Sequence, residues 1–229
     1  MKPSALAKIQ REVISCELCP RLREHCQLVA DQKRRAYLDW DYWGRPVPSF
    51  GDPAARLLLI GLAPGAHGAN RTGQMFTGDS SGDFLFRAMH KAGFASQPEC
   101  RTRQDGLQLI DAYITGAARC APPDNKPLPE ELANCRPYLE RELVVLKKVE
   151  VVVTLGRIAF EAYLGILKDQ GRIEKPSDYK FEHGKVHHLK PYVITSYHPS
   201  QQNTQTGRLT SEMFLDIFYL ASSLMRHSS

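Results

Sequence analysis

Residues 57–83 read LLLIGLAPGAHGANRTGQMFTGDSSGD, and this stretch decides how the rest of the chain is arranged. It begins with the apolar run 57–60, as expected for a parallel strand that is covered on both faces. A loop with glycines at 61, 65, 68, 73 and 78 follows, and glycine permits positive φ and the close approach of a ligand. Asp79, Ser80 and Ser81 are good N-cap residues for an apolar helix around 84–89. The stretch therefore predicts the ligand crevice of an open α/β sheet.

The glycine loop is too long and too varied in chemistry for a simple connection. It carries the polar and aromatic side chains His67, Asn70, Arg71, Phe76 and Asp79. A Walker A loop ends in Gly-Lys-Ser/Thr, and this loop does not. The dinucleotide pattern G-x-G-x-x-G is also absent. Generic binding of nucleotide phosphates is therefore not supported.

The remaining pattern alternates strands with helices over 229 residues, which predicts one α/β domain with a mostly parallel sheet between helical layers. Three further apolar segments are predicted strands: 111–115, 151–155 and 193–197. Helical spacing predicts helices over 4–15, 21–38, 80–92, 129–148, 156–167 and 209–226. The connections are predicted to be irregular at 39–55, a hairpin or loop at 168–190 and a polar loop at 199–208.

The net charge of +5 and the pI of about 8.9 permit contact with nucleic acid. No apolar run approaches the roughly 20 residues that span a bilayer. The N-terminus, MKPSALAKIQREV, carries charges throughout, unlike a secretory signal. We expect a cytoplasmic monomer with no membrane partner, whose six cysteines do not form structural disulfides.

Four of the cysteines suggest a metal site. Cys16 and Cys19 form a C-x2-C pair, and Cys120 and Cys135 flank a proline-rich loop and the start of a helix. Four thiolates suit either zinc or an iron–sulfur cluster, and the wide spacing of the second pair favours a cluster. Cys26 and Cys100 have no partner at ligand spacing, so they are predicted to be buried thiols. The alternative is that all six are scattered core residues.

A second loop, 196–204, follows the last predicted strand and reads SYHPSQQNT. It should open on the same sheet edge as the glycine loop, because parallel strands end at one edge. His198 lies at the strand end, before a proline and among hydrogen-bonding side chains. This position favours a functional role over a structural one.

The motifs GLAPGAHGANRTGQMFTGDSSG, RCAPPDNKP and SYHPSQQNTQTGRLT together resemble the uracil-DNA glycosylase superfamily, in particular family 5, the type B enzymes. The resemblance covers nearly the whole chain. It implies a single domain over 1–229, a three-layer α/β/α sandwich with a four-stranded parallel sheet, and an N-terminal cluster-binding segment. It also implies a [4Fe-4S] cluster with the ligands Cys16, Cys19, Cys120 and Cys135.

The resemblance implies base excision repair of double-stranded DNA. The N-glycosidic bond of uracil, and of other deaminated or damaged bases, is hydrolysed and an abasic site remains. The nucleotide must flip out of the duplex, and bond breaking is dissociative, with an oxocarbenium ion on the sugar and an anion on the base. The alternatives are a lesion-binding protein without catalysis and a cluster-bearing enzyme that acts on free nucleotides.

By the same resemblance, Phe76 stacks on the flipped base and Asn125 hydrogen-bonds its edge. His198 reaches the base O2 or the adjacent minor groove. Backbone N–H groups near Ala63 and Gly65 bind base oxygens in the manner of an oxyanion hole.

The chain departs from its relatives at two motif positions. Ala63 stands where the best-known uracil enzymes carry a carboxylate that orients water, and Gly116 occupies the place of an asparagine that reads uracil. Both losses predict a roomier pocket that accepts uracil, hydroxymethyluracil, ethenocytosine or hypoxanthine. Asp79 is the candidate for the missing carboxylate, and the rival interpretation is an N-cap. Asp83 is a weaker candidate.

The loop 201–208 is predicted to enter the minor groove as a polar wedge, with Gln202 and Asn203 on DNA. Arg71, Arg119 and Lys126 lie near the motifs and are predicted to hold phosphates.

Overall fold

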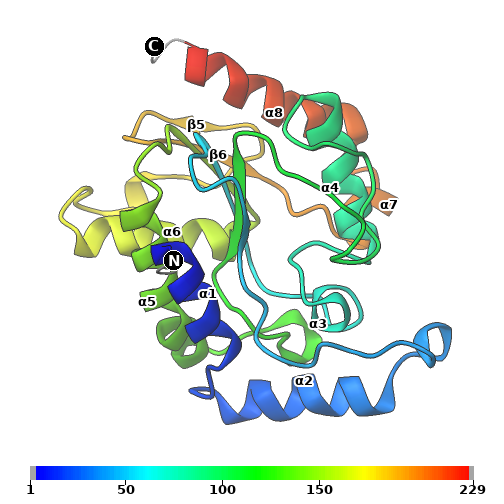
Figure 1. The fold of residues 1–229 in the computed structure, drawn as a ribbon. Coiled ribbons are helices and arrows are strands. Elements are labelled where there is room, and N and C mark those ends of the chain that lie inside the picture. The colour runs from blue at the N-terminus through cyan, green and yellow to red at the C-terminus, as the bar shows by residue number, and fades with distance from the viewer. Residues whose placement is uncertain (1–3, 227–229) are drawn as a thin grey trace.

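A computed structural model describes residues 4–226 and shows a sheet between two layers of helices (Figure 1). The sheet order is β1-β3-β2-β4-β6-β5. Four central strands pair in parallel, as predicted: β3 (Ala112–Gly116), β2 (Leu57–Gly61), β4 (Val151–Leu155) and β6 (Tyr192–Ser196). Two short antiparallel strands extend the edges, β1 (Phe50–Gly51) and β5 (Val186–His187). The sequence analysis placed β1 in an irregular connection and β5 in a hairpin or loop, because a two-residue strand has no periodicity.

Alternate residues of the buried strands serve the two cores. Leu57 and Leu59 of β2 pack with α4 and α8, whereas Leu58 and Ile60 pack with α5 and α6. This follows from the period of two in a strand, whose successive side chains point to opposite faces. The α-helices are α1 (Ala5–Ile14), α2 (Pro20–Gln32), α3 (Ala69–Thr72), α4 (Ser80–Lys91), α5 (Pro129–Val145), α6 (Arg157–Asp169), α7 (Gln201–Gln205) and α8 (Ser211–Arg226). The 3-10 turns are η1 (Arg35–Tyr37), η2 (Pro123–Asn125) and η3 (Pro176–Asp178).

Two helix predictions were wrong in detail. The helix predicted over 21–38 ends at Gln32, because Lys33 takes a φ of 53°, in the left-handed region that an α-helix cannot continue. The predicted polar loop 199–208 contains the short helix α7, which Ser200 caps through its side chain. None of the helices within 4–226 is long and apolar enough to cross a membrane.

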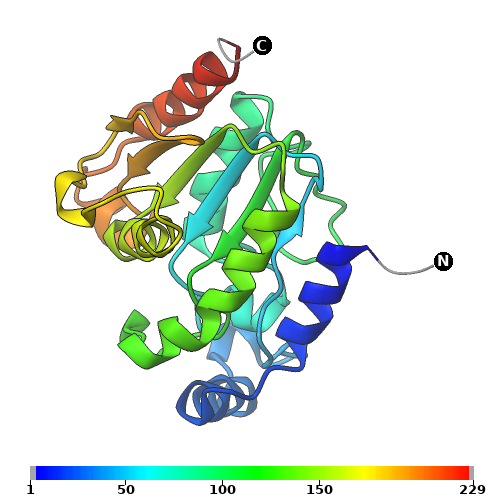
Figure 2. The ribbon, with the colours of Figure 1, turned by 90° about the vertical axis from the view of Figure 1, so that its left-hand side faces the viewer.

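The parallel register sets where the loops meet. Gly61 at the end of β2 lies opposite Gly116 at the end of β3, and Leu155 of β4 lies opposite Ser196 of β6. The carboxyl ends of all four strands therefore lie at one edge of the sheet, which the arrowheads in Figure 2 mark. The glycine loop, the proline-rich loop and the loop with His198 all begin at this edge.

A buried ion pair ties this edge to the helix layer. Arg119, which follows β3, donates from Nη2 to Glu142 of α5 at 2.6 Å, and the two side chains are 1% and 0% exposed. Glu142 also accepts from the Thr115 hydroxyl at 2.6 Å and from that of Ser49. Because Arg119 is buried, it cannot reach a DNA phosphate, and that prediction was wrong.

We expect Glu142→Ala to lower the free energy of unfolding by about 3–5 kcal/mol, because it leaves the buried Arg119 charge without its partner. Glu140→Ala is the matched control on the same helix, since Glu140 only pairs with Arg136 near the surface; it should cost about 0.5 kcal/mol. Denaturant unfolding of both variants measures this. Equal losses would contradict a special role for the buried pair.

Candidate active site

Two rings face each other at the carboxyl edge of the sheet. Phe76 of the glycine loop and His198, just after β6, are stacked with centroids 5.9 Å apart and an interplanar angle of 29°. The two residues come from distant parts of the chain, and the sequence analysis assigned both to one pocket. The structure brings them together.

The backbone of the glycine loop holds Phe76 in an unusual conformation. Its φ is 55°, in the left-handed region that bulky side chains rarely adopt. A Cβ on Gly61 would lie 2.9 Å from the ring, and a Cβ on Gly82 would overlap the Phe76 carbonyl oxygen. Glycine at these two positions thus provides the space that Phe76 occupies.

Gly61 and Gly116 are buried and end β2 and β3 without side chains. They are partners in the register of β2 and β3, so their Cα atoms lie side by side. A Cβ on Gly116 would approach the Ala118 carbonyl oxygen to 3.0 Å and the Met75 methyl to 3.3 Å. The space over these two glycines is therefore taken by the Phe76 ring and the Met75 methyl group.

Asp79 has two separate contacts. Its Oδ1 accepts from the Gly82 N–H at 3.0 Å, which caps α4 and confirms the N-cap interpretation. Its Oδ2 faces the turn that holds Gly65 and Gly68: a Cβ on Gly65 would lie 2.7 Å from this oxygen, and one on Gly68 would collide with it. Burial raises the pKa of Asp79, and hydrogen bonds from the backbone N–H groups of Gly82 and Ser81 oppose this. The N-cap role thus leaves one carboxylate oxygen directed at the glycine loop.

His198 is neutral at neutral pH. Burial lowers the pKa of its imidazole to about 4, because the charged form loses its hydration. The Asn203 side-chain amide donates to the His198 carbonyl oxygen at 2.8 Å and fixes the loop from α7. Asn203, predicted to contact DNA, thus has a bond within the protein, whereas Gln202 is exposed.

Arg71 stabilises the glycine loop by hydrogen bonds to two of its carbonyl oxygens. It is 3% exposed and donates to the carbonyl oxygens of His67 at 2.8 Å and Gly78 at 2.7 Å. Its guanidinium lies 3.9 Å from the ring centres of both Tyr37 and Trp40. This placement does not support the predicted contact with a phosphate.

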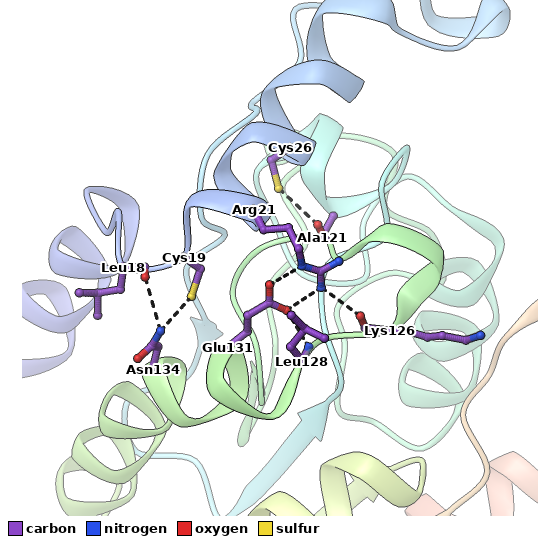
Figure 3. A network of polar contacts seen from close by, with 9 residues as sticks. All are labelled: Leu18, Cys19, Arg21, Cys26, Ala121, Lys126, Leu128, Glu131 and Asn134. Atoms are coloured by element: carbon purple, nitrogen blue, oxygen red, sulfur yellow. Dashed lines mark hydrogen bonds and ion pairs between the residues drawn. The ribbon is translucent and has the colours of Figure 1, made fainter.

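The proline-rich loop is clamped to the N-terminal segment (Figure 3). Arg21 of α2 donates from Nε and Nη2 to the two carboxylate oxygens of Glu131, each at 2.8 Å, and from Nη2 to the Lys126 carbonyl oxygen at 3.3 Å. Glu131 also accepts from the Leu128 N–H at 2.7 Å. Asn125, inside this loop, is exposed with a φ of 56°, and within 4–226 its side chain makes no hydrogen bond. The structure does not bring Asn125 into contact with Phe76 or His198.

The four predicted ligand cysteines share one region. Cys16 and Cys19 lie between α1 and α2, Cys120 follows β3, and Cys135 lies in α5. Their thiols are close enough to affect one another: Cys120 and Cys16 raise the pKa of Cys19, and Cys120 and Cys19 raise that of Cys135. In both cases burial is the largest cause. The donor set fits a group bound by thiolates.

Neighbouring side chains line this region. Asn134 donates to the Cys19 sulfur at 3.4 Å (Figure 3). Cys26, predicted to be a buried thiol, is fully buried; it contacts Cys120 and donates to the Ala121 carbonyl oxygen at 3.6 Å. In the described part of the chain no three His, Cys, Asp or Glu side chains converge on a single-ion site.

A sequence model of the uracil DNA glycosylase superfamily matches residues 48–220. The chain belongs to this superfamily. A type-5 uracil-DNA glycosylase of Thermus thermophilus is 51% identical over 216 residues, which cover 92% of this chain and 94% of the relative. One of Pyrobaculum aerophilum is 42% identical over 92% of this chain and 89% of its own. A type-4 uracil-DNA glycosylase of Sulfurisphaera tokodaii is 26% identical over 98% of this chain and 88% of its own. These relatives confirm the resemblance to family 5.

Sequence reasoning missed part of the site. A cavity of about 380 Å³ adjoins His198. Arg157, Phe181 and Arg208 line it together with Leu62, Leu155, Gly156, Ile158, Ala159, Tyr197 and Asn203. Arg157 begins a helix and Phe181 lies in a polar connection, so no local motif marks either residue.

We expect the His198 ring to remain neutral from pH 8 to pH 5 and to titrate near pH 4. Its folded-state pKa is below the value of about 6.5 in unfolded chains, so its contribution to stability is present above pH 6.5 and is lost as the pH falls through 4. Ring nitrogen shifts in NMR measure the titration, and His198→Asn should remove this part of the pH dependence of unfolding. A midpoint near 6.5 would contradict the burial argument.

Proposed function

We propose that this protein is a uracil-DNA glycosylase that hydrolyses the N-glycosidic bond of uracil in double-stranded DNA and leaves an abasic site. The single observation that carries this is the stacked pair of Phe76 and His198 at the carboxyl edge of the sheet, in a chain 51% identical to a type-5 uracil-DNA glycosylase. The net charge of +5 suits DNA as the partner. We expect the protein to act on cytoplasmic DNA as a monomer.

The proposed reaction begins when the nucleotide flips out of the duplex and its base stacks on Phe76. The glycosidic bond then lengthens, with positive charge on the sugar and negative charge on the base. Neutral His198 donates an N–H to the base O2, and the backbone N–H groups of Ala63 and Gly65 donate to base oxygens. Preorganised donors of this kind stabilise charge that develops only in the transition state.

Asp79 is the proposed carboxylate of the reaction. Its Oδ1 is engaged in the cap of α4, while Oδ2 faces the turn at Gly65 and Gly68. From there it would orient the attacking water or stabilise the sugar cation. A carboxylate has these roles only when it is ionised, so the pKa raised by burial sets the acid limit of activity.

Gly116 and Ala63 support a broad substrate range. Without a polar side chain at Gly116 to read uracil, and with Ala63 in place of a carboxylate, the pocket has no strict filter for uracil. We propose that hydroxymethyluracil, ethenocytosine and hypoxanthine are also excised. The proposed wedge residue is Gln202, which is exposed on α7, the helix that follows His198 in the chain.

Cys16, Cys19, Cys120 and Cys135 would hold a [4Fe-4S] cluster. When bound, it would supply a structural cross-link between the N-terminal segment, the loop after β3 and helix α5, and no chemistry on the base. The Arg21–Glu131 clamp joins the same elements and orders the loop that bears Asn125. Asn125 would contact the base edge from this loop.

Single-turnover cleavage of duplexes with G:U, A:U and G:hypoxanthine pairs, followed as alkali-labile breaks, tests the activity. We expect cleavage of all three. Activity on uracil alone would refute the broad range. Binding without cleavage, by protein that contains its cluster, would replace the enzyme with a lesion-binding protein.

We expect Asp79→Asn to lower single-turnover cleavage by at least ~10²-fold. The amide oxygen can still cap α4, so unfolding should change little. Asp83→Asn is the matched control, because Asp83 is a first-turn charge of α4 whose charged neighbours are Arg87, Glu99 and Arg101. In the parent protein the rate should fall as the pH drops through the raised pKa of Asp79. An unchanged rate in Asp79→Asn would remove Asp79 from the mechanism.

Cys120→Ser should abolish the visible absorption and the bound iron of the purified protein and lower its thermal stability, because a thiolate ligand is lost. Cys100→Ser is the control, since that buried thiol contacts Thr77 and Gln74 and lies outside the cysteine region. Iron analysis, absorption spectra and thermal melts measure the effect. Full iron content in Cys120→Ser would contradict the ligand assignment.

A further inference from the structure

A groove leads from His198 away from the glycine loop. The cavity of about 380 Å³ beside His198 shares Arg157 and Phe181 with a second recess of about 500 Å³. This recess lies between α6 and the segment 176–182 that precedes β5. β5 runs antiparallel to β6 with Val186 opposite Ile194, and the preceding Glu182 carbonyl oxygen accepts from the Thr195 hydroxyl near the end of β6. The recess therefore opens on the same sheet edge as the stacked pair of Phe76 and His198.

Two arginines are held at the start of this groove. The Arg157 guanidinium lies 5.2 Å from the centre of the Phe181 ring, and that of Arg208 lies 4.5 Å from the Tyr197 ring. The two rings contact each other, with centroids 6.2 Å apart. Among residues 4–226, the one ion pair of Arg157 is a long one, 3.9 Å from Glu161, and its side chain is 64% exposed. Stacked guanidinium groups keep their N–H edges free, which suits a phosphate.

The recess beyond Arg157 has aromatic and charged walls. Its walls include the half-buried rings of Tyr179 and Phe181, whereas Phe160 at its base is buried and stacked on His187. Glu161, Glu182 and Lys180 also line it. Its two carboxylates are balanced by Arg157 and Lys180, so the lining has no excess of positive charge for a phosphate, and the carboxylates can accept hydrogen bonds from the amino groups of a base. Aromatic walls bind nucleobases of any sequence by stacking, and the volume lies in the usual range of ligand pockets.

We propose that this groove binds the DNA strand that carries the lesion, on one side of the flipped nucleotide. Arg157 and Arg208 hold a phosphate next to that nucleotide, and the recess at Phe181 holds the neighbouring base in an unstacked position. The proposal rests on the proposed glycosylase function. It adds a second base site to the one at Phe76.

The phosphate contact is tested by a double-mutant cycle, in which a protein substitution and a phosphate replacement are made separately and together. The probe is a duplex with a 2′-fluorinated uracil nucleotide, which resists cleavage, in which each phosphate within three positions of the uracil is replaced in turn by an uncharged methylphosphonate. At one position we expect about tenfold weaker binding by the parent protein, as for the loss of one charge-assisted contact. The double variant Arg157→Ala/Arg208→Ala should bind at least about tenfold more weakly to the unmodified duplex and lose nothing further at that position, and Arg157→Ala alone should lose less there than the parent.

The control for the phosphate test is Lys168→Ala, because Lys168 is an exposed cation near the other end of α6. It should bind the unmodified duplex like the parent and keep the parent's response to every methylphosphonate. Arg157→Ala should also reduce the slope of log affinity against log salt by about 1. Additive losses at all positions would overturn the phosphate contact.

The base site is tested with the neighbouring base removed. On the side identified by the cycle, an abasic analogue next to the uracil should weaken binding by the parent about tenfold. Phe181→Leu keeps apolar bulk but removes the ring, so it should show no such loss. Tyr219→Leu is the control, because Tyr219 is an exposed aromatic on α8. An equal loss in Phe181→Leu and in the parent would overturn the base site.

Base release separates this inference from the proposed function. If the parent releases uracil and the cycles show no coupling, the groove fails and the glycosylase stands. If no uracil is released from any duplex, the proposed function itself fails, and the groove with it.

Discussion

The structure depends on the parallel register of its four central strands. Gly61 lies opposite Gly116 and Leu155 opposite Ser196, so the four strands end at one edge. A shift by one residue would turn the buried side chains of a strand to the opposite face and leave both cores unpacked. The hydrophobic cores therefore fix the register, and the register places the glycine loop beside the loop of His198. The position of the site is therefore set by the packing of strand residues that do not themselves belong to it.

The absence of side chains shapes the site as much as their presence. Phe76 fits only because Gly61 and Gly82 have no Cβ, and the Asp79 carboxylate fits because Gly65 and Gly68 have none. Cβ atoms at these positions would displace the ring or the carboxylate. The backbone can therefore approach a base closely, and its N–H groups can donate to a ligand. This explains why the glycine loop can hold the bulky ring of Phe76 at a positive φ.

Several arginines near the site bind other parts of the protein and are not free to contact a ligand. Arg71 is stacked between aromatic rings, Arg119 is paired with Glu142, and Arg21 is bound to Glu131 through two hydrogen bonds. Each of these arginines joins segments far apart in the sequence. Exposed cations such as Arg157 are therefore the ones available to a nucleic acid. The net positive charge of the chain does not distinguish internally paired arginines from exposed ones.

The sequence by itself determined the α/β class and the four central strands, which rest on local signals such as apolar runs, glycine spacing and turn residues. Phe76 and His198 were placed in one pocket by motifs that resemble a known family, and the structure confirms that the two rings meet. The four cysteines remain predicted ligands. Only the tertiary structure decided that Arg71 and Arg119 are internal, that Asn203 holds the loop of His198, and that Arg157 and Phe181 lie beside it. The reason is physical. Burial and partnership of a charge depend on residues distant in the chain, which a local pattern does not contain.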